Sequence, residues 1–131
     1  MTRSPKEADA VRSLDRLRGI CLALPQATEK ETWGIPTFRV KDKIFAMGFD
    51  AAVWCKAPDG VQAILVGAAP ARFFVPPYVG RRGWIGFRLD AATDWDEVGA
   101  LVQRSFRMTA PKRLTALVPE HVDGTLAGTG R

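Results

Sequence analysis

The chain has 131 residues, the size of one domain, of which 47% are hydrophobic and 25% are charged. These proportions are those of an ordinary globular protein, so they exclude a fibrous repeat and a largely disordered chain. Nineteen Lys and Arg against fourteen Asp and Glu give a net charge of +5, which favours anionic partners.

The first predicted element is a helix from about Pro5 to Ala23, because Val11, Leu14 and Leu17 recur at helical spacing. It ends at Leu24, since the residue before a proline is pushed out of the helical region. A polar linker follows over residues 26–34.

Three strands are expected next, at residues 36–41, 44–49 and 52–56, since apolar and polar residues alternate in them. Residues 41–43 form a tight basic turn between the first two strands. The alternation turns Phe38 and Val53 toward a core and Trp54 away from it.

The second half of the chain reads helix, strand, helix. Pro58-Asp59-Gly60 opens a helix that Pro70 stops, and a loop then leads to a strand over residues 84–89. Asp94 is expected to cap the last long helix, with Glu97 completing a capping-box spacing. Ala110-Pro111 breaks this helix, and one or two further turns follow over residues 112–118.

The predicted order is α-β-β-β-α-β-α, an α+β fold with a small, mostly antiparallel sheet and helices packed on one face. Residues 1–118 are expected to form the single domain, and the Gly-rich and Thr-rich residues 119–131 a flexible C-terminal tail.

Helices on one face leave the other face of the sheet exposed, and this face is expected to be basic and aromatic. Cations that neutralise phosphates beside aromatic rings that stack on bases form a sequence-tolerant nucleic-acid platform. Tryptophan and arginine also serve as ordinary cover for a sheet, and that alternative stays open. The residues expected there are Arg39, Lys41, Trp54, Lys56, Trp84 and Arg88.

Further cations lie in the predicted loops and turns. Lys41 and Lys43 flank the hairpin tip, a candidate wing against phosphates. Arg81 and Arg82 stand between Gly80 and Gly83, a spacing known from KH domains, but here a strand follows instead of a helix, which favours a simple turn.

A third cluster and a candidate cleft complete the set of predicted binding residues. Lys112 and Arg113 follow the break at Pro111, beyond the reach of the dipole of the preceding helix. Trp33 and Tyr78, together with Lys56, are candidates for a cleft.

The residues for catalysis and metal binding are scarce. His121, the only histidine, falls in the expected tail, so histidine triads and zinc sites are disfavoured. Cys21 and Cys55 occupy core-facing positions and are too few for a disulfide framework, which indicates packing in a reducing cytosol. No phosphate-binding glycine loop is present. We expect no enzyme activity, no cofactor and no metal.

Membrane association is not expected either. The longest apolar run, residues 63–71, is far shorter than the ~20 residues that span a bilayer. The first residues, MTRSPKEADAVR, lack the apolar core of a secretory signal. We expect a cytoplasmic protein, and a monomer.

Five segments in this order and spacing resemble the MmcQ/YjbR-like family over nearly the whole chain, the tail excepted. They are TWGIPTFRVKDKIFA (Thr32–Ala46), WCKAP (Trp54–Pro58), RFFVPPYVGRRGWIG (Arg72–Gly86), DWDEV (Asp94–Val98) and APKRL (Ala110–Leu114). The resemblance implies a compact CyaY/frataxin-like fold, for which a double-wing mode of DNA binding has been proposed, and it brings no catalytic residues. Iron binding is not implied, because the first helix mixes Arg12, Arg16 and Arg18 with its few acids.

The leading hypothesis is therefore a DNA-binding domain without strong sequence readout, acting through the basic, aromatic face and the loops. The alternative is a protein-protein or small-anion binding module with no nucleic-acid role, which would use the candidate cleft.

Overall fold

The computed structural model describes residues 5–118. The expected tail, with His121, lies outside these residues. The elements are α1 Pro5–Leu22, β1 Thr28–Thr32, β2 Ile35–Val40, β3 Lys43–Gly48, β4 Ala52–Cys55, α2 Val61–Ala68, β5 Phe73–Phe74, the 3-10 turn η1 Gly80–Arg82, β6 Ile85–Arg88, α3 Trp95–Thr109 and α4 Lys112–Thr115.

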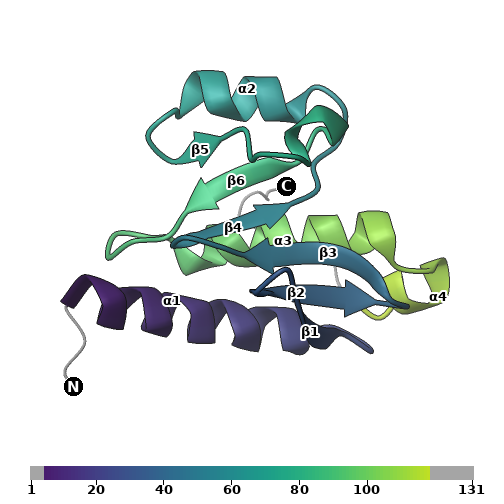
Figure 1. The fold of residues 1–131 in the computed structure, drawn as a ribbon. Helices are drawn as coiled ribbons and strands as arrows, with labels where there is room; N and C mark the ends of the chain where they lie inside the picture. Colours follow the sequence, from purple (N-terminus) through teal and green to yellow (C-terminus); the bar gives the residue numbers. More distant parts are fainter. Residues whose placement is uncertain (1–4, 119–131) are drawn as a thin grey trace.

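The strands form one six-stranded sheet in the order β1-β2-β3-β4-β6-β5, and every neighbouring pair is antiparallel. Helices α1 and α3 lie against one face of this sheet (Figure 1). The predicted α+β fold, with its antiparallel sheet and helices on one face, is confirmed.

The first four strands form a meander joined by three two-residue hairpin turns. In each turn both central residues have positive φ, the pattern of the type I′ turn that matches the twist of paired strands. Glycine, asparagine and aspartate favour such turns, yet half of the six positions here hold other residues. The central pairs are Trp33-Gly34, Lys41-Asp42 and Asp50-Ala51.

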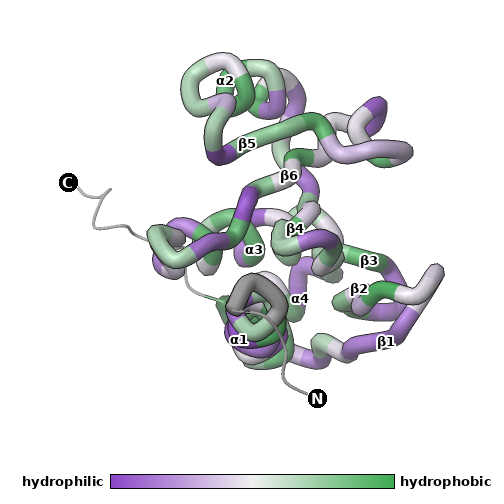
Figure 2. Tube along the Cα trace, turned by 60° about the vertical axis from the view of Figure 1, so that its left-hand side comes forward, coloured by the Kyte–Doolittle hydropathy of each residue, from purple (hydrophilic) through white to green (hydrophobic). Residues whose placement is uncertain are grey.

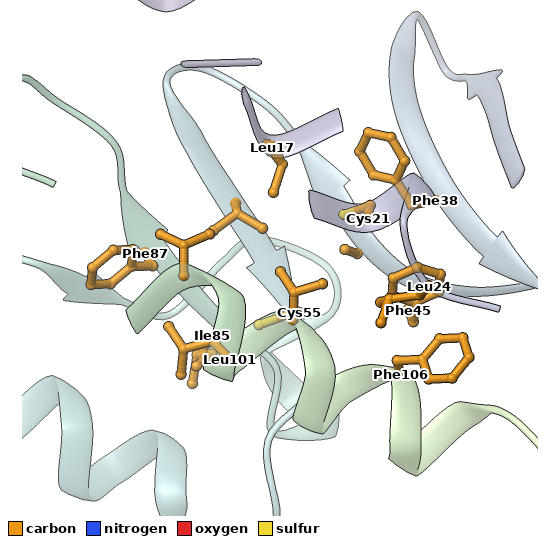
Figure 3. Close-up of a cluster of buried hydrophobic side chains, with 14 of the residues drawn as sticks. Leu17, Cys21, Leu24, Phe38, Phe45, Cys55, Ile85, Phe87, Leu101 and Phe106 are labelled. Atoms are coloured by element: carbon orange, nitrogen blue, oxygen red, sulfur yellow. The ribbon is translucent and has the colours of Figure 1, made fainter. Parts of the chain in front are cut away.

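The main core fills the space between the sheet and the helices (Figure 3). Phe45 of β3 meets Phe106 of α3 edge to face, with ring centroids 5.4 Å apart. Cys21 and Cys55 are buried in this core, as their positions predicted. Burial raises the pKa of the Cys55 thiol to about 12 and that of Cys21 well above its ordinary value, so both stay protonated at neutral pH.

A buried serine ties α3 to the centre of the sheet. The Ser105 hydroxyl donates a hydrogen bond of 2.6 Å to the carbonyl oxygen of Phe45, and it accepts one of 2.8 Å from the backbone N–H of Lys56. Lys56 directly follows β4, so this serine fixes the point at which the chain leaves the sheet.

Two strands lie where the sequence indicated none. β1 falls in the segment predicted as a linker, since its residues are polar and do not alternate; its register with β2 makes it a strand. β5 has only two residues, too few for periodicity to reveal, and it pairs with β6. Asp94 caps α3 as expected, accepting from the N–H groups of Asp96 and Glu97.

Candidate functional site

The face of the sheet opposite α1 and α3 is partly covered by the segment that follows β5. Figure 2 shows this segment and the turn between β1 and β2 on one side of the sheet, with α3 on the other. Phe74 of β5 and Val79 of the segment pack against a second, smaller apolar cluster made of Met47, Ala52, Trp54 and Trp84. The Gln62 side chain holds the segment by donating to the carbonyl oxygens of Gly80 (2.8 Å) and Trp84 (2.6 Å).

The predicted stacking platform is therefore wrong in one respect. Trp54 and Trp84 are only 7% and 6% exposed, so they do not offer open ring faces. Strand alternation assigned them to the correct face, but it could not show that a distant loop returns over that face. The indole N–H of Trp54 has no acceptor among residues 5–118.

Arg88, also expected on this face, contacts β5 and the loop before it. Its guanidinium lies 4.8 Å from the centre of the Phe74 ring and donates to the carbonyl oxygens of Pro70 and Ala71. Phe74 in turn covers Gly86, where a Cβ would stand 2.3 Å from a ring carbon. Arg88 is thus tied to the loop before β5 and lines neither hollow described below.

Beside this cluster lies a cation-rich depression of about 600 Å³, here called the basic hollow. Four of its lining side chains are cationic and two are acidic, so positive charge is in excess. The charged residues are Arg39, Lys43, Lys56 and Arg82, with Asp42 and Asp59.

Arg39 is a structural member of the basic hollow. Its guanidinium donates to the hydroxyls of Thr37 (3.2 Å) and Thr32 (3.0 Å) and to the carbonyl oxygen of Asp42 (3.2 Å), and it pairs with the Asp42 carboxylate at 3.4 Å. Most of its donors are therefore committed to bracing the β2–β3 hairpin.

The other three cations have no such partners. Within residues 5–118, the side chains of Lys43, Lys56 and Arg82 make no hydrogen bond or ion pair with another residue. Burial lowers the pKa of Lys56, and the positive charges of Lys43 and Arg82 lower it further. The three charges thus repel one another around a space that an anion could occupy.

Burial and this repulsion together predict a gain in stability when Lys56 loses its charge. A lowered pKa means that the unfolded chain binds more protons, so the free energy of unfolding rises with pH between the lowered pKa and the ordinary lysine value. Lys56→Met keeps the apolar stem and should increase the free energy of unfolding at pH 7 by about 0.5 kcal/mol or less, because solvent screens the charges.

Urea denaturation over a pH series measures this effect, and the gain should shrink as pH rises through the lowered pKa. Lys30→Met, on the exposed strand β1 and outside the basic hollow, is the matched control for loss of one lysine. A stability loss at pH 7 in Lys56→Met would contradict the repulsion.

A second depression, of about 640 Å³, adjoins the basic hollow and is here called the aromatic cleft. Its lining is almost entirely apolar. Trp33 and Tyr78 stand at it with 78% and 92% of their surfaces exposed, and both have positive φ. The cleft is lined by Trp33, Ile35, Met47, Phe49, Trp54, Pro77, Tyr78 and Val79.

The two depressions are continuous, because Trp33, Met47 and Val79 line both of them. One end of the combined site is cationic and the other is apolar and aromatic. A ligand that fits both ends carries an anionic group next to a flat or apolar one.

Six of the predicted binding residues line the basic hollow: Arg39, Lys43, Lys56, Arg82, Trp33 and Trp84. Three line the aromatic cleft: Trp33, Tyr78 and Trp54. Like Arg88, four other predicted cations line neither depression; exposed on turns and on α4, they are Lys41, Arg81, Lys112 and Arg113. Sequence reasoning missed Ile35, Met47 and Val79. Alternation could have placed Ile35 beside Thr37 on this face, whereas nothing local indicated Val79.

The described residues include no helix long and apolar enough to cross a membrane. They also include no cluster of three His, Cys, Asp or Glu side chains that could hold a metal ion.

Fold and site together define an α+β domain with an open antiparallel sheet, helices on one face and a cationic, aromatic depression on the other. The chain belongs to the YjbR family, whose model matches residues 22–108. The fold is similar to the crystal structure of Deinococcus radiodurans protein DR2400, which carries the domain DUF419; the TM-score is 0.68 at 19% identity, over 85% of this chain and 92% of that one. No curated protein matches the chain.

Proposed function

We propose that this protein is a cytoplasmic, non-catalytic binding domain that holds the phosphate backbone of nucleic acid in the basic hollow. The observation that carries the proposal is the convergence of Lys43, Lys56 and Arg82, whose side chains make no ion pair within residues 5–118. Burial lowers the pKa of Lys56 and the charges of Lys43 and Arg82 lower it further; a bound phosphate would offset that repulsion.

The wider charge distribution supports the same ligand. Lys41 and Arg81 are exposed next to Asp42 and Arg82, which line the hollow, and Lys112 and Arg113 follow the end of α3, where Met108 lines it too. A polyanion would reach these flanking cations, whereas a free phosphate would meet only the hollow.

Salt dependence tests the proposal. If three phosphates are neutralised, the logarithm of the association constant should fall against log salt with a slope of about −2 on single strands and about −2.7 on duplex DNA. Fluorescence anisotropy with labelled strands at several salt concentrations measures both slopes. Arg82→Gln should reduce the single-strand slope by about 0.7.

Arg12→Gln is the matched control, because it removes the same charge from exposed α1. It should leave the slope nearly unchanged, and equal effects of the two variants would indicate attraction by net charge alone. Absence of binding at low salt would reject the proposal. Competition by inorganic phosphate as strong as by DNA would favour the small-anion alternative.

A further inference from the structure

The geometry points to a more specific ligand, which rests on the proposed function: we infer that the aromatic cleft receives one unpaired base of a single strand whose phosphates lie in the basic hollow. Trp33 and Tyr78 come from two segments far apart in the sequence and line the same cleft. Flat apolar rings of this kind offer stacking surfaces to any base.

The backbone under both rings is unfavourable for a bulky residue. Trp33 has φ 55° and Tyr78 has φ 66°, in the left-handed region that asparagine and glycine occupy more readily. Neither ring recovers this cost by burial, since both are largely exposed. Large exposed rings at positions that local preferences oppose indicate a role in binding.

The floor of the cleft suits a flat ring as well. Met47 and Ile35 supply apolar contacts. The ring centroids of Phe49 and Trp54 are 5.4 Å apart, with an angle of 67° between the ring planes. Met47 and Val79 also border the basic hollow, so apolar side chains lie where the two depressions meet.

Charge complementarity selects a nucleotide over a purely apolar guest. The cationic end adjoins the aromatic end directly, as phosphate adjoins base along a strand. A paired base inside a duplex keeps its faces stacked on its neighbours, so it cannot enter the cleft without leaving the helix. The site should therefore prefer single strands.

The test compares a labelled oligothymidylate with a strand of the same length in which the central thymines are replaced by abasic sites. Both carry the same phosphates. The wild-type protein should bind the intact strand about ten-fold or more tightly than the abasic one. Trp33→Asn and Tyr78→Asn should each lower affinity for the intact strand about five-fold or more. Tyr78 lines only the aromatic cleft, so Tyr78→Asn should leave abasic binding unchanged.

Asparagine is chosen because it tolerates positive φ, so both variants should keep their turns; thermal unfolding verifies this. Arg82→Gln serves as the comparison, since it should weaken both strands alike. Equal binding of the two strands by the wild-type protein overturns the base site and leaves phosphate binding intact. Loss of abasic binding in Tyr78→Asn also overturns it. Failure of both strands to bind rejects the proposed function itself.

Discussion

Replacing Ser105 with alanine should lower the free energy of unfolding by about 2–4 kcal/mol, because it leaves two buried backbone groups without partners. The serine is fully buried, and its hydroxyl serves both the Phe45 carbonyl oxygen and the Lys56 N–H. An alanine methyl group fills similar space but offers neither donor nor acceptor. Urea denaturation followed by far-ultraviolet circular dichroism measures the loss.

Thr109→Ala is the matched control on the same helix. The Thr109 hydroxyl donates to the Ser105 carbonyl oxygen, within the helix and at a partly exposed position, so its loss should cost well under 1 kcal/mol. Similar losses in both variants would contradict a special role of the Ser105 bridge. The Ser105 bridge also matters for binding, because it fixes the backbone of Lys56, whose side chain lines the basic hollow.

A second large effect is expected at Gly86. Glycine in a strand interior is ordinarily a weak residue, and alanine there should stabilise the protein. Here the new Cβ would stand 2.3–2.7 Å from three ring carbons of Phe74. Gly86→Ala should therefore lower the free energy of unfolding by about 1–3 kcal/mol. The ring must move, and its contact with Arg88 is lost with it.

A double-mutant cycle isolates this clash. In a Phe74→Ala background, Gly86→Ala should be neutral or slightly stabilising, since the obstructing ring is gone. Gly19→Ala, at an exposed site of α1 where nothing lies within 4 Å of the added Cβ, should stabilise by about 0.5–1 kcal/mol. A destabilising Gly86→Ala in both backgrounds would show that Phe74 is not the cause.

Periodicity predicted the core side of the sheet well. Phe38, Val53 and Phe87 face the helices as alternation requires, and all three are buried. The pattern works because a strand in a sheet with one helical face has only two choices for each side chain.

Periodicity could not predict that the segment after β5 covers part of the sheet face opposite α1 and α3. Val75 to Gly83 carry no period, and their position depends on contacts over long sequence distances, from Gln62 and from the fit of Phe74 on Gly86. The cations of the basic hollow were each recognisable as candidates. Their grouping, with Lys41 and Arg88 left out, required the positions of three separate segments.

The three two-residue hairpins make the site depend on residue count. Each turn has only two residues, so inserting one residue in a strand of the meander would reverse the faces of the residues beyond it unless a bulge absorbed it, as the register shift between Phe38 and Arg39 does. Ile35 and Met47 reach the floor beside Trp33 only because every turn and strand between them has its present length. The lengths of the strands and turns in the meander therefore determine which side chains face the site. Insertions should be better tolerated outside residues 28–55.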